Sequence, residues 1–143
     1  MASITGATTV ISLSITGIFS SPQQLQGFAA DDVFGTNPID SAEFYMGVDG
    51  KMSGGFVYVP IGQNYHLQAD SPSNVLFDTW WTTMVAQRNV FFAQGVAIFT
   101  AIGTKWNMTN GLLTSYTPTP TVKKLLQPRT HGITWESISP AAS

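Results

Sequence analysis

The segment "SPSNVLFDTWWTTMVAQ", residues 71–87, contains apolar residues that repeat with the period of an α-helix. Relative to the first of them they fall at i+1, i+4, i+5 and i+8, which places them along one stripe of a helix: Leu76, Phe77, Trp80, Trp81 and Met84. Ser71 is expected to cap this helix, and Pro72 to occupy its first position, where proline loses no hydrogen bond. We therefore predict a helix over residues 72–87.

The apolar stripe of this helix is expected to pack against a sheet through Phe77, Trp80, Trp81 and Met84. An alternative interpretation is that the adjacent tryptophans form a platform on which a ligand stacks. Asp78 is expected to interact weakly with the positive end of the helix dipole, because it lies beyond the first turn.

Segments on both sides of the helix alternate apolar and polar residues with a period of two, which predicts strands with one buried face. The side chains expected to face inward are Thr9, Ile11, Leu13 and Ile15, then Tyr65, Leu67 and Ala69, and finally Ile133 and Trp135. Further strand-like segments are "AEFYMGV" and "GGFVYVP", with Asp49 and Gly50 as a turn between them, and residues 95–103 and 104–116. The proline-spaced residues 117–128 are expected to form an ordered or extended connection.

This order of elements predicts a mainly β fold with a single domain over residues 1–143. A parallel sheet would need helices between its strands, and one helix is predicted here. We therefore expect an antiparallel β-barrel or sandwich that closes on itself, with one flanking α-helix across an opening or face.

The composition points to a subunit of an assembly. Charged residues make up 10% of the 143 residues, against about 25% in a typical soluble domain, while 43% are hydrophobic. Some apolar surface is therefore expected to be buried against another subunit. The net charge of −2 offers no basic patch for tight nucleic-acid binding, and the absence of cysteine excludes disulfides and thiolate metal sites.

No segment approaches the roughly 18 apolar residues of a membrane helix. The start "MASITGATTV" lacks the basic and apolar regions of a signal peptide, so synthesis in a cytoplasm without export is expected.

The sequence contains no recognisable catalytic, cofactor-binding or metal-binding pattern. His66 and His131 are far apart and are interpreted as ordinary surface or interface residues. Asp31 and Asp32 could form an acid pair, but adjacent residues of an extended strand point to opposite faces, so loop solvation or turn capping is expected. The glycine-rich "GVDGKMSGG" lacks the spacing and following helix of a phosphate loop, and no serine lies in a GxSxG frame. An enzyme is not expected.

Several phrases nevertheless resemble one family when they are taken in order. They are "GFAADDVFGTNPID", "AEFYMGVDGKMSGGFV", "LQADSPSN" before the aromatic helix, and "GLLTSYTPTPTVKKLLQPRTHGITWESISP". Together they cover nearly the whole chain, and they are similar to the tail tube protein of contractile-tailed bacteriophages and their prophage relatives. "MGVDGKMSGG", "LQADSPSN" and the closing "QPRT" and "ITWES" are the most specific of these phrases.

The resemblance implies a structural virion protein. Homohexameric rings would stack into a tube within a contractile sheath, and DNA would pass through the channel without sequence-specific binding. The implied partners are copies of the chain, the tail sheath protein, and baseplate and tail terminator proteins, with no membrane involved. The implied location is the virion tail, after assembly in the host cytoplasm.

The resemblance also implies that the loop over residues 43–56 reaches into the next ring, while the helix lies outside the lumen. The residues of the inter-ring contact would be Gly47, Val48, Asp49, Gly50, Lys51, Met52 and Ser53.

Two alternatives stay open at the level of sequence. The tube protein of a phage-tail-like bacteriocin or of a type VI secretion system would share this architecture. A glycan-binding β-sandwich would also be mainly β and would display exposed aromatic side chains on a sheet.

Overall fold

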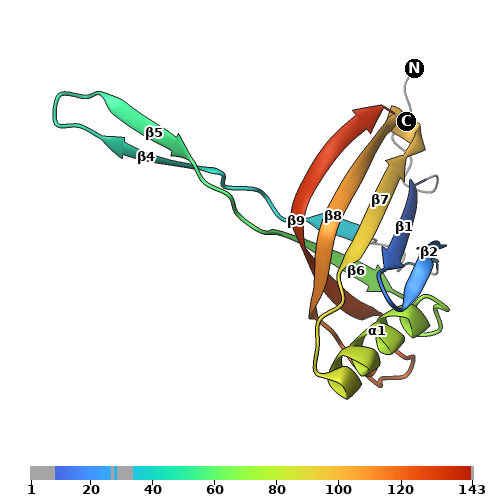
Figure 1. The fold of residues 1–143 in the computed structure, drawn as a ribbon. Coiled ribbons are helices and arrows are strands. Elements are labelled where there is room, and N and C mark those ends of the chain that lie inside the picture. The colour runs from blue at the N-terminus through green and yellow to red at the C-terminus, as the bar shows by residue number, and fades with distance from the viewer. Residues whose placement is uncertain (1–8, 27, 29–33, 143) are drawn as a thin grey trace.

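The structure of the protein is a computed structural model that describes residues 9–26, 28 and 34–142. An antiparallel sheet of seven strands, a separate two-stranded hairpin and the helix α1 make up the described part (Figure 1). The elements are β1 Thr9–Ile15, β2 Phe19–Gln24, β3 Phe34–Thr36, β4 Ala42–Met46, β5 Met52–Phe56, β6 Ile61–Leu67, α1 Asn74–Gln87, β7 Ala93–Phe99, the short 3-10 helix η2 Thr100–Ile102, β8 Thr104–Ser115 and β9 Arg129–Ala142. The predicted mainly β, antiparallel fold class with one flanking α-helix is confirmed.

The seven-stranded sheet curls over on itself. Its strand order is β2-β1-β7-β8-β9-β6-β3, so β7 and β3 are separated by three intervening strands. In a flat sheet with strands about 4.8 Å apart, β7 and β3 would lie roughly 19 Å apart. The ring centroids of Phe34 on β3 and Phe99 on β7 are instead 6.4 Å apart. The β3 edge therefore curls over towards β7, an inner strand of the other half of the sheet.

The chain after β2 crosses from one edge of the curled sheet towards the other. Leu25 donates its backbone N–H to the carbonyl of Ile11 on β1, and Phe28 forms a single antiparallel bridge with Leu67 on β6. Within the described ranges, β2 and β3 themselves do not pair. Closure of the predicted barrel therefore depends on this crossing segment and on side-chain packing.

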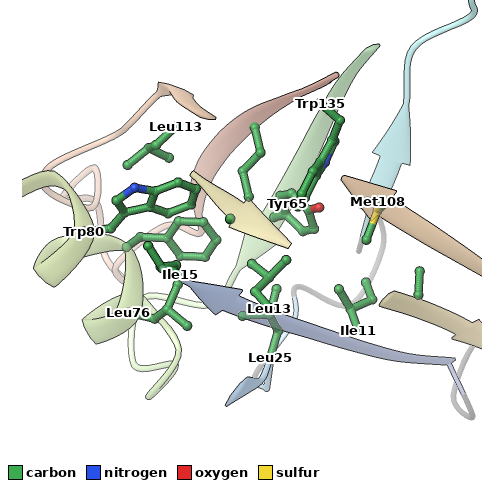
Figure 2. Close-up of a cluster of buried hydrophobic side chains, with 14 of the residues drawn as sticks. Ile11, Leu13, Ile15, Leu25, Tyr65, Leu76, Trp80, Met108, Leu113 and Trp135 are labelled. Atoms are coloured by element: carbon green, nitrogen blue, oxygen red, sulfur yellow. The ribbon is translucent and has the colours of Figure 1, made fainter. Parts of the chain in front are cut away.

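The alternation predicted for the strands is present in the core. Seven of the predicted inward residues are completely buried: Ile11, Leu13 and Ile15 of β1, Tyr65 and Leu67 of β6, and Ile133 and Trp135 of β9. Figure 2 shows several of these side chains converging with Leu76 and Trp80 from α1. The expectation was wrong for Thr9 and Ala69, which are partly exposed, because Thr9 begins its strand and Ala69 lies in the turn beyond β6.

A buried glutamine satisfies the polar atoms of two core aromatic residues. The side-chain oxygen of Gln63 accepts a hydrogen bond from the Tyr65 hydroxyl at 2.5 Å and another from Trp135 Nε1 at 2.9 Å. Its amide nitrogen donates to Thr36 Oγ1 on β3 at 3.1 Å. An unpaired polar atom in this interior would be destabilising, so Gln63 is needed for the core to contain the Tyr65 hydroxyl and the Trp135 indole N–H. The hydrogen bond to Thr36 also connects β3 to β6.

The helix begins two residues later than predicted. α1 starts at Asn74 after Ser73, which forms no side-chain cap. Ser71 instead accepts the backbone N–H of Ser73 and donates to the carbonyl of Gln26 on the crossing segment. Residues 71–73 thus form a turn whose serine hydroxyl groups hydrogen-bond to the backbone of Gln26, which lies 45 residues before Ser71.

The adjacent tryptophans differ in their surroundings. Trp80 is completely buried with Phe77 and donates its Nε1–H to the carbonyl of Phe91 at 3.0 Å. Trp81 is 42% exposed and stacks on Tyr116, and Met84 is partly buried at the edge of the core. Trp80 therefore packs in the core as predicted, whereas Trp81 lies on the outer surface against Tyr116.

A bulge in β8 makes room for the core tryptophan of β9. Asn110 adopts a left-handed backbone with φ of 49°, and the pairing with β7 shifts register there. A Cβ on the following residue, Gly111, would lie 2.5 Å from the ring of Trp135. Both residues lie inside one continuous strand, as expected for the predicted segment 104–116.

Candidate functional site: the exposed hairpin

The β4–β5 hairpin projects from the body of the molecule as a long arm (Figure 1). Its strands pair in antiparallel register from Ala42 opposite Phe56 to Met46 opposite Met52. At the tip, Gly47 donates to the carbonyl of Lys51 at 2.7 Å and Gly50 donates to the carbonyl of Gly47 at 3.0 Å. The hairpin is therefore an ordered element although it does not pair with the seven-stranded sheet.

The predicted turn chemistry is found at this tip. Gly50 has a φ of 84°, a conformation that glycine adopts without strain. Asp49 accepts the backbone N–H of Lys51 through Oδ1 at 3.1 Å. The seven residues expected to contact a neighbouring ring, Gly47 to Ser53, lie together at this tip and are all exposed.

Every residue of both hairpin strands is exposed to solvent. Because directly opposed residues share a face of a two-stranded ribbon, the register assigns one face to six residues without a polar side chain. They are Ala42, Phe44, Met46, Met52, Gly54 and Phe56. We call these residues the apolar face of the hairpin.

The other face of the ribbon carries Glu43, Tyr45, Ser53 and Gly55. Its Tyr45 is 82% exposed, and beyond the ribbon Tyr58 is 91% exposed and meets Phe56 edge to face at 4.8 Å. Such a continuous set of exposed aromatic and methionine side chains is costly in water and marks an interaction surface. The sequence predicted two strands here, but it placed the second over residues 54–60 instead of Met52–Phe56, and it did not predict that both faces of the arm are exposed.

A second group of functional candidates links α1 to β9, and the sequence did not predict it. Arg129, which is 5% exposed, donates to Asp78 Oδ1 at 2.7 Å and to the carbonyl of Thr117 at 2.8 Å. Its guanidinium also lies 5.6 Å from the ring centre of Tyr116, whose hydroxyl hydrogen-bonds to Asp78. Asp78 thus binds the last strand and its preceding loop, whereas a weak helix-dipole role was expected.

The prediction that His131 is a surface or interface residue is wrong for this subunit, because its side chain is completely buried. It stacks on Phe77 at 4.4 Å and on Tyr116 at 5.3 Å. Nε2 lies 3.2 Å from Asn74 Oδ1, while Nδ1 has no hydrogen-bond partner among the described residues. Since Asn74 uses its amide nitrogen to donate to Gln68, its oxygen accepts the proton on Nε2.

The environment of this group favours a neutral histidine and an ionised aspartate. Burial, helped by the charge of Arg129, lowers the pKa of His131 to about 4. Partial burial raises the pKa of Asp78, but hydrogen bonds from Arg129 and Tyr116 outweigh it and hold that pKa below its ordinary value. The group therefore links the helix to the last strand of the sheet.

The described residues contain no cluster of three or more His, Asp or Glu side chains that could hold a metal ion. His66 pairs with Thr130 on the strand surface, at 2.9 Å, away from His131. Asp31 and Asp32, the considered acid pair, lie outside the described residues. Of the helices in the described ranges, none is long and apolar enough to cross a membrane.

The open end of the curled sheet contains an apolar cavity of about 370 Å³. Phe34, Phe99, Trp106 and Ile138 form its apolar lining together with the root of the hairpin at Pro38 and Ile39. Asn37, Thr36 and Gln63 are its polar residues, and Gln63 is already bonded within the core. Among the residues that the structure describes, none that lines this cavity is charged.

Solved structures with this fold come from contractile injection systems. A chain of the anti-feeding prophage cap, the tube-terminating cap, superposes with a TM-score of 0.68 at 11% identity, covering 100% of this chain and 93% of that one. A chain of the PVC sheath/tube terminator in the extended state gives 0.64 at 12% identity and 99% coverage of both chains. A chain of the PVC sheath-tube complex gives 0.63 at 12% identity, covering 99% of this chain and 93% of that one.

These similarities establish the fold, since each identity is far below the level at which function transfers. No curated protein matches the sequence. A family model does match, over residues 2–139, and its description is a tail fiber protein rather than a tail tube protein. The match spans nearly the whole chain, so this protein belongs to the family described as Tail fiber protein gp32.

Proposed function

We propose that this protein is a structural subunit of the inner tail tube of a contractile-tailed particle. Copies form homohexameric rings that stack into a tube, and DNA passes through its channel into the host cell. The observation that carries the proposal is the hairpin arm, whose residues 42–56 are all exposed and whose apolar face has nothing to cover it within the described subunit. A neighbouring copy would remove this surface from water.

The fold supports the same proposal. Three similar chains belong to a sheath-tube complex, a sheath/tube terminator and a tube-terminating cap. Within the described ranges, the outer edges of β2 and β3 are unpaired and could extend the sheet between subunits, and a closed ring would use them up. Low charge fits a subunit whose faces are occupied by copies of itself, and sparse basic residues suit a channel through which DNA slides without sticking.

In this proposal the outer surface of the tube contacts the tail sheath protein, and its ends contact baseplate and tail terminator proteins. The protein acts in the virion tail after assembly in the host cytoplasm, and it is not an enzyme. The tube of a phage-tail-like bacteriocin or type VI secretion system is the alternative within the same architecture.

Negative-stain electron microscopy of the concentrated protein, together with light scattering, tests the proposal. We expect rings and tubes with a central channel. Monomers over a broad concentration range would contradict it, and glycan binding by such a monomer would favour the β-sandwich alternative. Single rings that never stack would indicate a terminator or cap subunit instead.

A further inference from the structure

The two ends of the curled sheet differ in how the described residues cover them. α1 lies at the end where β7 begins, and the apolar cavity of about 370 Å³ lies at the other end, where β7 ends and β8 begins (Figure 1). Its three aromatic wall residues, Phe34, Phe99 and Trp106, are each partly exposed. Because Pro38 and Ile39 at the root of the hairpin complete the wall, we call this space the root cavity.

The root cavity suits an uncharged apolar group. A cavity of roughly 150 Å³ in a protein core holds one benzene molecule, so the root cavity has room for about two side chains of similar size. None of the described residues that line it is charged. Gln63, one of its polar residues, already bonds to Tyr65, Trp135 and Thr36. A charged or strongly polar group would therefore lose its hydration there without gaining partners.

Two methionines form the outer end of the apolar face of the hairpin. Met46 and Met52 lie directly opposite each other in the ribbon, and both side chains are more than half exposed. The charged residues of the hairpin lie elsewhere, Glu43 on the opposite face and Asp49 and Lys51 in the turn. Methionine adapts its shape to irregular spaces, and its sulfur packs favourably on aromatic rings. The methionine pair therefore matches the root cavity in size and in chemistry.

The arm needs a second surface, and its own subunit does not provide one among the described residues. A hairpin of two strands is at best marginally stable in water without a further layer. Figure 1 shows the arm pointing away from the body, and β4 carries Met46 about 13 Å beyond Ala42. The methionine pair therefore cannot fold back into the cavity at the root of the same arm.

The arm is long enough to reach the root cavity of another copy. At about 3.3 Å per residue, the chain from Pro38 to Asp49 spans up to roughly 35 Å, and the same rise gives the strand β8 a similar length. The arm thus reaches about one body length from its root. A contact between two different surfaces of identical subunits is heterologous, and when it does not close it generates an open stack.

We propose that the methionine pair of one copy inserts into the root cavity of a copy in the adjacent ring. Met46 and Met52 pack against the aromatic wall, and the receiving copy extends its own arm from the rim of the same cavity. The inference rests on the proposed stacking of rings and names the receiving surface, which the stacking itself leaves open.

Substitution of the two methionines in the full-length chain tests the contact from the side of the arm. We expect Met46→Gln with Met52→Gln to keep the circular dichroism spectrum and melting of the parent, because both side chains are exposed in the subunit. Pelletable tube mass should fall about tenfold or more, since two amides would enter an apolar cavity without partners. The matched control, Leu125→Gln with Leu126→Gln, changes two exposed residues of the β8–β9 connection and should assemble like the parent.

Filling the cavity tests the contact from the receiving side. Ala97 is buried in the cavity wall, and in Ala97→Leu the longer side chain extends into the empty space, so melting should be at least as high as in the parent. The filled cavity no longer admits the methionines, and we expect single rings without tubes. If Ala97→Leu folds poorly, the methionine variant decides the question, because it does not touch the core.

Three results would overturn the inference: normal tubes from the methionine variant, normal tubes from a folded Ala97→Leu chain, or equal loss of tubes in the leucine control. The proposed function would stand in these cases, since it fails only when the parent chain forms no tubes.

Cross-linking tests the same contact in intact tubes. Because the chain has no cysteine, Ile39→Cys with Met46→Cys introduces a single pair. The two sites cannot join within one chain, since β4 alone is about 13 Å long and a disulfide needs Cα atoms within about 7 Å. Mild oxidation should therefore link neighbouring copies into a ladder that extends beyond six chains on denaturing gels.

The control chain carries Met46→Cys with Leu125→Cys, an exposed site on the β8–β9 connection, and should give no ladder. A ladder that stops at six chains would place the contact within one ring and contradict the proposal. Absence of a ladder, or a ladder from the control alone, would contradict it as well.

Discussion

The curled sheet and the β4–β5 hairpin contain the same kinds of apolar side chain in opposite surroundings. Leu13, Tyr65 and Trp135 of the sheet are completely buried, while Phe44 and Met52 of the hairpin are each about two-thirds exposed. Burial of the first set stabilises the monomer through the hydrophobic effect. The second set contributes nothing comparable until another surface covers it, so folding and assembly depend on different parts of the chain.

The largest expected effect is the loss of tube assembly, without loss of folding, when the hairpin is shortened. Deletion of residues 48–53 from the hairpin should leave circular dichroism and melting nearly unchanged, because none of these side chains contributes to the core. The same deletion should abolish long tubes in electron micrographs, while single rings can survive through strand edges elsewhere. Tubes of normal length would show that the arm is an ordinary hairpin.

The adjacent tryptophans sharpen the comparison within α1. Trp80→Ala should lower the free energy of unfolding by roughly 3–5 kcal/mol, because it empties a fully buried site and removes the hydrogen bond to Phe91. Trp81→Ala should cost about 1 kcal/mol, since it removes a half-exposed ring stacked on Tyr116. Urea denaturation of both variants measures the difference. Equal costs would contradict the assignment of Trp80 alone to the core.

Acid should weaken the body through His131. Its pKa is about 4 in the fold and 6.5 in the unfolded chain, so between these values the unfolded state binds a proton that the folded state does not. Stability is therefore expected to fall by roughly 3 kcal/mol as the pH decreases from 6.5 to 4. The pKa of Asp78 is lowered as well, so it adds a loss with the same sign at still lower pH.

Urea titrations at several pH values measure this dependence. His131→Gln should flatten the slope between pH 6.5 and 4, because the variant has no imidazole to protonate. A slope that is unchanged in the variant would assign the acid sensitivity to other groups.

The smallest effect compares two glycines. Gly111→Ala should destabilise the body by about 1–3 kcal/mol, because the new Cβ would lie 2.5 Å from the Trp135 ring and the core would have to shift. Gly55→Ala, in the hairpin, meets no atom within 4 Å and should change stability by less than about 0.5 kcal/mol. Thermal melts of the two variants provide the comparison, and a larger loss from Gly55→Ala would reverse it.

Local pattern accounts for most of the elements that the sequence predicted. The alternation predicted around Ile11, Tyr65 and Ile133 reflects a property of each strand alone, since successive side chains point to opposite faces. The stripe from Leu76 to Met84 likewise reports the period of the helix. Gly50 could be assigned to a turn because few other residues adopt its backbone conformation without strain.

Contacts between distant residues could not be predicted in this way. Asp78 and Arg129 are 51 residues apart, and the partner that buries His131 on one side, Tyr116, belongs to the β8–β9 connection. Their pairing depends on α1 packing beside the start of β9, which no single segment encodes. The helix start was misplaced for the same reason, because Ser71 bonds to the distant Gln26 instead of capping the helix.

For this protein, the sequence by itself determined most of the strands, though not β2 and β3, together with the approximate span of the helix and the residues that turn the hairpin, because these depend on neighbours a few positions apart. Only the tertiary structure decided that one set of alternating strands encloses a core while residues 42–56 stand free. An apolar face looks the same in sequence whether its own subunit or another copy covers it. The physical difference is whether other strands or the helix of the same subunit pack against that face, and this depends on how the whole chain folds.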